Sequence, residues 1–211
     1  MSPAILSAAA TFGFVTSITP GPNNMMLLAS GLNFGVRRTL PHMFGISTGY
    51  VVLMLAAGFG MGEVLRDLPG AFVALKIVGG LYMLWLAWHI ARAAPPSEEV
   101  AEGETPSAAS SSKNRPMSFL GAVAFQWVNP KAWVIVVTAV ATYVAPNDLV
   151  RDLVIVTGVC GLINVPSVGV WALFGASLRR LLRDPIWRRR FNVTMALLLV
   201  ASLWPLLATA P

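Results

Sequence analysis

The sequence predicts an all-α integral membrane protein. Its six transmembrane helices form two inverted three-helix repeats, and helices 1 and 4 are broken. Three observations support this fold class. Of the 211 residues, 56% are hydrophobic and only 11% are charged, against about 25% charged residues in a typical soluble domain. The apolar residues gather into six runs separated by polar stretches. Prolines interrupt two of these runs at corresponding positions.

The six apolar runs are the expected membrane spans, because a helix needs about 20 mostly apolar residues to cross a bilayer. Helices are expected, since backbone groups in lipid must satisfy their hydrogen bonds within the segment. The runs also lack the alternation of apolar and polar residues typical of a membrane β-barrel. The expected spans are 4–32, 41–62, 69–91, 117–144, 150–176 and 191–209.

The basic residues between the spans predict the orientation. Most of the 15 Lys and Arg residues lie in the loops after spans 1, 3 and 5. The positive-inside rule places these loops in the cytoplasm, so both termini are expected outside. We expect a lipid bilayer around the chain and no nucleic-acid partner, because the basic residues do not form one polar face.

A low-complexity stretch divides the chain. Residues 93–116 are rich in Ala, Ser, Pro and Glu and contain no aromatic residue, which predicts a flexible cytoplasmic linker. The linker separates a first three-helix repeat, 1–92, from a second, 117–211. Because each repeat has an odd number of spans, similar halves would lie in opposite orientations.

The proline interruptions match between the halves. When Gly121 is laid on Gly13, Pro130 falls on Pro22. A straight helix over 4–32 would be about 43 Å long at 1.5 Å per residue, whereas the hydrocarbon core is about 30 Å thick. A broken first span therefore fits better, and interrupted segments at matching positions indicate a transporter's binding site.

The chemistry of the breaks suggests a site for an anionic group. Proline is favoured at the first position of a helix, so Pro22 and Pro130 can each begin a half-helix, the second one capped by Asn129. Each new N-terminus presents N–H groups and a positive dipole end, which suit a carboxylate. The candidate substrate-binding residues are Thr19, Pro20, Gly21, Pro22, Asn23, Asn24, Gln126, Asn129, Pro130, Lys131 and Asn164.

Two of these residues, and the prolines, leave alternatives open. An ammonium inside a span costs roughly 2.5–3.5 kcal/mol on insertion scales. Lys131 either extends to the membrane interface or attracts a substrate carboxylate and takes part in gating. Asn164 either reaches the central site or makes an interhelical hydrogen bond. The two prolines could also be ordinary packing kinks.

No carboxylate lies deep in any expected span. A site for a metal or a strongly cationic solute would favour buried acidic or thiolate ligands. The sequence also has no nucleotide-binding or metalloprotease motif. We therefore expect no cofactor, no metal site and no enzymatic activity, and lysine or arginine is disfavoured as a solute.

Four sequence segments carry a family resemblance: "TPGPNN" in span 1, the small residues around Gly45 and Gly49 in span 2, "GGLYMLWLAW" in span 3 and "NPKAW" in span 4. Over nearly its whole length the chain resembles the LysE superfamily, in particular its RhtB-like homoserine/threonine exporters. The resemblance implies secondary export of amino acids or related small metabolites across the bacterial cytoplasmic (inner) membrane. It also implies protons as the coupling ion and allows a homodimer.

The resemblance and the missing carboxylates together favour small neutral amino acids as the exported solutes. Three alternatives remain open on the sequence alone. They are efflux of another small solute or a cation, an intramembrane enzyme or lipid-handling protein, and a membrane protein that transports nothing.

Overall fold

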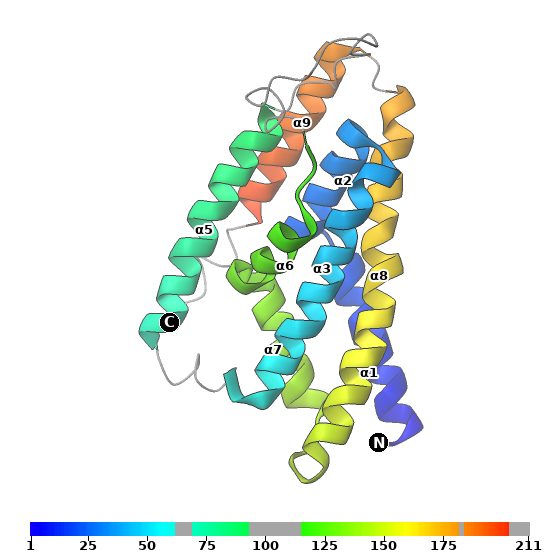
Figure 1. The fold of residues 1–211 in the computed structure, drawn as a ribbon, viewed down its shortest axis with the longest axis vertical. Coiled ribbons are helices and arrows are strands. Elements are labelled where there is room, and N and C mark those ends of the chain that lie inside the picture. Colours follow the sequence, from blue (N-terminus) through cyan, green and yellow to red (C-terminus); the bar gives the residue numbers. More distant parts are fainter. Residues whose placement is uncertain (62–68, 93–114, 182–183, 203–211) are drawn as a thin grey trace.

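The computed structural model describes residues 1–61, 69–92, 115–181 and 184–202, and the regular structure in these ranges is entirely helical (Figure 1). This confirms the all-α prediction for the described residues. The expected linker 93–116 lies almost wholly outside them, as does the end of the sixth expected span. The elements are α1 (Pro3–Ile18), α2 (Pro22–Phe34), α3 (Val36–Ala56), η1 (Ala57–Met61), α5 (Pro69–Ala91), α6 (Phe119–Val128), α7 (Pro130–Tyr143), η2 (Pro146–Asp148), α8 (Leu149–Leu181) and α9 (Pro185–Ala201).

The first and fourth expected spans each fold as two helices. α1 and α2 meet at 54°, and α6 and α7 meet at 71°. Pro22 and Pro130 each occupy the first turn of the second helix, as predicted. In Figure 1, α2 lies above α1, whereas α7 lies below α6, so the two broken segments run in opposite directions. The broken helices are therefore confirmed.

Length and hydropathy identify up to four membrane spans among the described residues. Two continuous stretches qualify, Val36–Met61 and Pro146–Arg179, and each of the two bent pairs qualifies if it counts as one span. In α5, the apolar stretch Ile77–Ala91 is shorter than this test requires. The expected count of six spans stays a prediction.

Two helices begin earlier than the sequence predicts. α3 starts at Val36 rather than at 41, because Gly35 alone connects it to α2 with a φ of 77°, a backbone conformation that favours glycine. α9 starts at Pro185 rather than at 191, because Asp184 accepts a hydrogen bond of 2.7 Å from the Ile186 N–H and caps the helix. The basic stretches 37–38 and 188–190 consequently lie within the first two turns of helices and not in loops.

Glycines bring the central helices into close contact. A Cβ added at Gly31 of α2 would collide with the carbonyl oxygen of Ala172 in α8, and one added at Gly175 would collide with that of Leu28. On α3, Gly45 lies in the same way against the backbone of Phe119 in α6. Small residues at such crossings allow the close backbone approach typical of membrane helix packing. α2, α3, α6 and α8 thus surround the two breaks.

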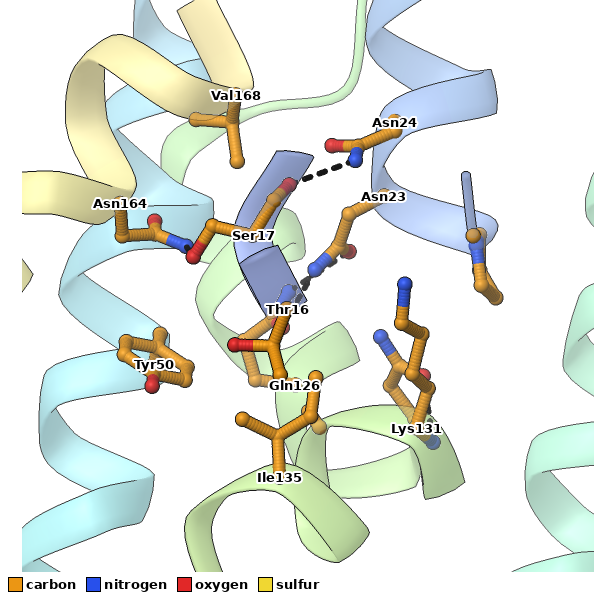
Figure 2. A pocket seen from close by; sticks show the side chains of 14 residues that line it. Thr16, Ser17, Asn23, Asn24, Tyr50, Gln126, Lys131, Ile135, Asn164 and Val168 are labelled. Atoms are coloured by element: carbon orange, nitrogen blue, oxygen red, sulfur yellow. Dashed lines mark hydrogen bonds between the residues drawn. The ribbon is translucent and has the colours of Figure 1, made fainter. Parts of the chain in front are cut away.

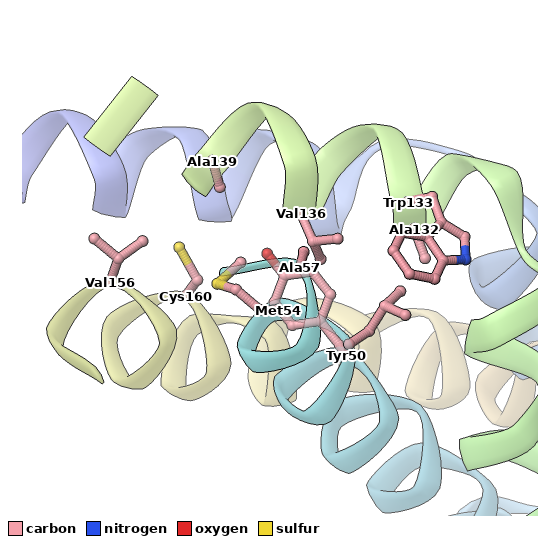
Figure 3. Close-up of a cluster of buried hydrophobic side chains, with 10 residues drawn as sticks. Tyr50, Met54, Ala57, Ala132, Trp133, Val136, Ala139, Val156 and Cys160 are labelled. Carbon is pink, nitrogen blue, oxygen red and sulfur yellow. The ribbon is translucent and has the colours of Figure 1, made fainter. Parts of the chain in front are cut away.

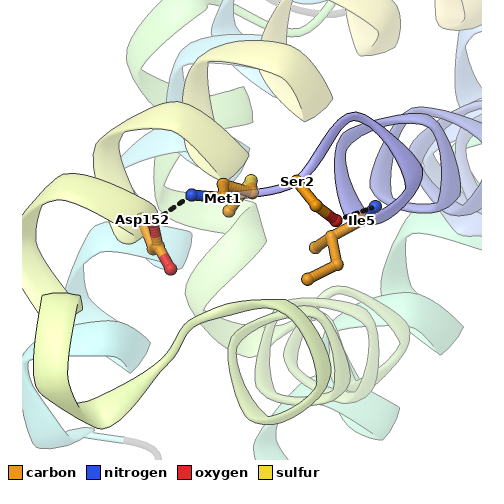
Figure 4. A network of polar contacts seen from close by, with 4 residues as sticks. All are labelled: Met1, Ser2, Ile5 and Asp152. Atoms are coloured by element: carbon orange, nitrogen blue, oxygen red, sulfur yellow. Dashed lines mark hydrogen bonds and ion pairs between the residues drawn. The ribbon is translucent and has the colours of Figure 1, made fainter.

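An apolar cluster packs below the breaks, between α3, α7 and α8 (Figure 3). Trp133 and Val136 of α7 lie there with Tyr50 and Met54 of α3 and Cys160 of α8. Beyond this cluster, the start of α1 is fixed by polar contacts (Figure 4). The α-amino group of Met1 lies 4.0 Å from Asp152 Oδ1, and Ser2 caps α1 by accepting from the Ile5 N–H.

Candidate functional site

A polar pocket lies between the two helix breaks (Figure 2). It encloses a cavity of about 30 Å³, enough for about two water molecules. Residues from both broken segments and from α3 and α8 line it: Thr16, Ser17, Gly21, Pro22, Asn23, Asn24, Tyr50, Gln126, Asn129, Lys131, Ala132, Ile135, Asn164 and Val168.

Most of the predicted site residues meet at this pocket. Three of the candidates do not line it. Thr19 and Pro20 form the break in the first segment and contact the Lys131 side chain, and Pro130 is buried at the start of α7. Six lining residues are not among the sequence candidates. Ser17 is recognisable from the sequence as a polar partner near Pro22, and Thr16 could have been found in the same way, because it is also a polar residue before the break. The other four, Tyr50, Ala132, Ile135 and Val168, carry no signal that separates them from ordinary packing residues.

Side chains from two other helices satisfy the last carbonyls of α1. Asn24 of α2 donates through Nδ2 to the carbonyl oxygens of Ser17 and Thr19, both at 2.8 Å. Trp171 of α8 donates through its indole N–H to the Ile18 carbonyl at 3.1 Å. A helix end leaves several backbone acceptors without intrahelical partners, and buried ones need donors. These residues therefore stabilise the broken end of α1.

Lys131, from the other half of the chain, also donates hydrogen bonds to the residues that follow α1. Its Nζ lies 3.1 Å from the Thr19 carbonyl oxygen, 3.2 Å from the Thr19 hydroxyl and 3.0 Å from the Pro20 carbonyl oxygen. The ammonium thus points at the break between α1 and α2. A cation beside a helix C-terminus also interacts favourably with the helix dipole.

Two amide side chains connect the breaks directly. Asn23 of α2 donates through Nδ2 to Gln126 Oε1 at 2.9 Å, and Gln126 of α6 donates through Nε2 to Asn23 Oδ1 at 3.1 Å. Gln126 is fully buried and also donates to the Ala122 carbonyl within α6. This reciprocal pair links the start of the second helix of one segment to the end of the first helix of the other.

Asn164 of α8 has both of the roles that the sequence leaves open, a place at the central pocket and an interhelical hydrogen bond. It lines the pocket. It also donates to the Ser17 hydroxyl at 3.0 Å and accepts from the Ser47 hydroxyl at 2.8 Å. The side chain therefore connects α8 to α1 and α3 at the level of the break.

The one charged side chain that lines the pocket is positive. Lys131 supplies an ammonium, and none of the residues that line the pocket is acidic. Across the described residues there is no group of three or more His, Cys, Asp or Glu side chains that could hold a metal ion. The arrangement suits an organic solute that carries a negative group.

Oppositely directed broken helices around a polar centre are found in many membrane transporters. The family model of the LysE type translocators matches residues 14–205, and the chain belongs to this family. Its members are translocators, so the protein is a transporter and not an enzyme. No solved structure matches the chain.

Curated relatives with the same overall length support this assignment. The chain is 34% identical over 202 residues to the cysteine/O-acetylserine efflux protein of Escherichia coli strain K12. The match covers 95% of this chain and 96% of the relative. The protein of the same name from Shigella sonnei matches with the same identity and coverage.

Proposed function

We propose that this protein exports small neutral amino acids or related zwitterionic metabolites across the bacterial cytoplasmic membrane, binding them between the two helix breaks. The observation that carries the proposal is the pocket itself, which joins amide side chains and one ammonium from both broken segments without a carboxylate. Cysteine and O-acetylserine, named for the relatives, are small zwitterionic amino acids. They fit the chemistry of such a site.

The charge of the pocket supports a zwitterion over a cation. A cationic solute would bring a second positive charge beside the half-buried Lys131 without an acidic partner, which is costly away from water. A zwitterion brings its own carboxylate. This argument also disfavours the alternative of metal or other cation efflux.

Substrate entry requires a change in conformation. The cavity of about 30 Å³ has room for about two water molecules, whereas even the smallest amino acid has five non-hydrogen atoms. We propose that the structure represents a closed state, and that the helices on one side of the breaks separate to admit the solute. Transporters with broken helices work in this way, by moving one group of helices against another around a fixed site.

An inverted repeat is the architecture that best accounts for the helix contacts. We propose six spans in two repeats, 1–92 and 117–211, with α5 and α9 as the third spans and residues 93–116 as the linker. Three helix contacts support this arrangement. α1 packs on α8 as α6 packs on α3, and α5 packs on α9. If a two-fold axis relates the halves, the α1–α8 contact is equivalent to the α6–α3 contact. The α5–α9 contact is then formed by two equivalent helices.

The proposed orientation places the basic end in the cytoplasm and both termini outside. The α2–α3 junction, the end of α5, the end of α8 and the start of α9 lie together at the upper end of Figure 1. Arginines occur at each of these places, and cytoplasmic ends of membrane proteins are enriched in them. Protons are the proposed coupling ion, as the resemblance to the RhtB-like exporters implies.

Intracellular metabolite pools test the function. A bacterial strain that overexpresses the protein should show lower intracellular and higher extracellular levels of one or more neutral amino acids than a strain with the empty vector. An inactive variant expressed to the same level in the membrane is the control. Unchanged pools of every neutral amino acid under excess supply would contradict the proposal.

A further inference from the structure

The two half-helix starts at the breaks are chemically unequal. At α7, the Asn129 side chain caps the helix by accepting from the Lys131 N–H at 3.2 Å. At α2, the corresponding residue is Gly21, and no side chain caps the helix. Pro22 has no N–H, and the first hydrogen bond within the helix is made by Met25. The N–H groups of Asn23 and Asn24 therefore lie at an uncapped helix start beside the pocket.

Lys131 adds positive charge at the same place. A Cβ at Gly21 would lie 2.7 Å from Lys131 Nζ, so the ammonium lies directly against the residue that precedes α2. The three hydrogen bonds of Nζ go to uncharged oxygen atoms of Thr19 and Pro20. The ammonium and the positive end of the α2 dipole thus meet without a counter-charge among the residues lining the pocket.

Asn24 offers a complementary acceptor. Its side chain is only 3% exposed, and Nδ2 is fully engaged by the Ser17 and Thr19 carbonyls. Oδ1 has no hydrogen-bond partner. Figure 2 shows the Asn24 amide among the side chains that line the pocket, with its nitrogen bonded to the Ser17 carbonyl oxygen. A buried oxygen in this position lacks a donor, and leaving such an atom unpaired is unfavourable.

We infer that the substrate carboxylate binds at the uncapped start of α2, beside Lys131, and not at the start of α7. The substrate ammonium then donates to Asn24 Oδ1. The inference rests on the proposed function and specifies it: the solute must carry a free carboxylate next to a primary amine. The start of α2 binds the carboxylate and the ammonium of the solute. The start of α7, already capped by Asn129, forms part of the pocket wall.

A pair of substitutions at Gly21 tests the carboxylate subsite. Serine at this position adds a hydroxyl that can cap the N–H groups of α2 and compete with the substrate. Alanine adds the same Cβ without the hydroxyl, so it is the matched reference. Both should be accommodated, because Gly21 has an extended backbone (φ −178°) and the atoms in the way belong to the end of the flexible Lys131 side chain. In proteoliposomes, the KM of Gly21→Ser for a transported amino acid should be about tenfold higher than that of Gly21→Ala.

Ligand analogues provide a second measurement that needs no variant. With the wild-type protein, the decarboxylated amine and the deaminated acid of a transported amino acid should each compete at least about tenfold more weakly than the amino acid itself. Equal KM values for the two Gly21 variants, or full competition by the amine, would overturn the carboxylate subsite. Full competition by the deaminated acid would overturn the role of Asn24. Failure of the wild type to transport any amino acid would instead refute the proposed function.

Discussion

The side chains of Asn23 and Gln126 donate hydrogen bonds to each other across the two helix breaks, at N···O distances of 2.9 and 3.1 Å. The two residues are 103 positions apart in the sequence and belong to different halves of the chain. Because each amide supplies both the donor and the acceptor for the other, neither can be removed without leaving its partner incomplete. The pair therefore couples the break in the first segment to the break in the second.

This coupling predicts non-additive effects of mutation. Asn23→Ala and Gln126→Ala should each destabilise the protein by about 1–3 kcal/mol, because each leaves the partner amide unpaired. The double variant should be less destabilised than the sum of the singles by about 0.5–3 kcal/mol. Unfolding of the purified protein in detergent measures this, with export rates per folded molecule recorded in parallel. Strictly additive losses would show that the two amides act independently.

Lys131→Met should destabilise the break as well as reduce transport. The substitution keeps an unbranched side chain but removes the donor to the Thr19 and Pro20 carbonyls. We expect a lower unfolding midpoint than in wild type, with Lys131→Arg intermediate because it keeps the charge and several donors. The sequence alone predicts only weaker affinity for solutes with a carboxylate. An unchanged midpoint for Lys131→Met would mean that these hydrogen bonds do not hold the break.

The crossing of α2 and α8 should tolerate no added methyl group. Gly31→Ala and Gly175→Ala each place a Cβ against a backbone carbonyl, and we expect losses of about 1–3 kcal/mol from overpacking. Gly80→Ala and Gly158→Ala are the matched controls, because a Cβ at either position meets no atom within 4 Å. Detergent-solubilised thermal stability separates the two groups. Equal stability of all four variants would contradict the close crossing.

Cysteine labelling in intact cells checks the orientation. In a Cys160→Ala background, Asp148→Cys should react with a membrane-impermeant maleimide added outside. Arg189→Cys, at the basic end, should react only after the membrane is permeabilised. Both positions are exposed on the folded chain. The reverse pattern would place both termini in the cytoplasm.

Local residue chemistry made the breaks predictable. Proline at the start of a half-helix and asparagine as its cap are preferences that act over two or three residues, and Pro22, Pro130 and Asn129 occupy the expected positions. The starts of α3 and α9 were less predictable, because a single glycine and an aspartate cap replace the longer loops that the charged stretches indicate.

The partners of the site residues could not be predicted in the same way. Lys131 bonds to Thr19 across 112 positions, and Trp171 bonds to Ile18 across 153. Such contacts depend on how the helices pack, and one sequence contains no local signal for them. The sequence therefore indicated which residues gather at the breaks. It did not indicate that Asn24, Lys131 and Trp171 satisfy the end of α1.

Transport by the purified protein tests the central claim most directly. Wild-type protein and the Asn23→Ala/Gln126→Ala variant, reconstituted at equal amounts of folded protein, should be compared for uptake or exchange of labelled neutral amino acids, cysteine and O-acetylserine included. We predict substrate-dependent flux with the wild type and a severe loss with the variant. The absence of flux for every neutral amino acid, in vesicles where a control transporter is active, would contradict the account.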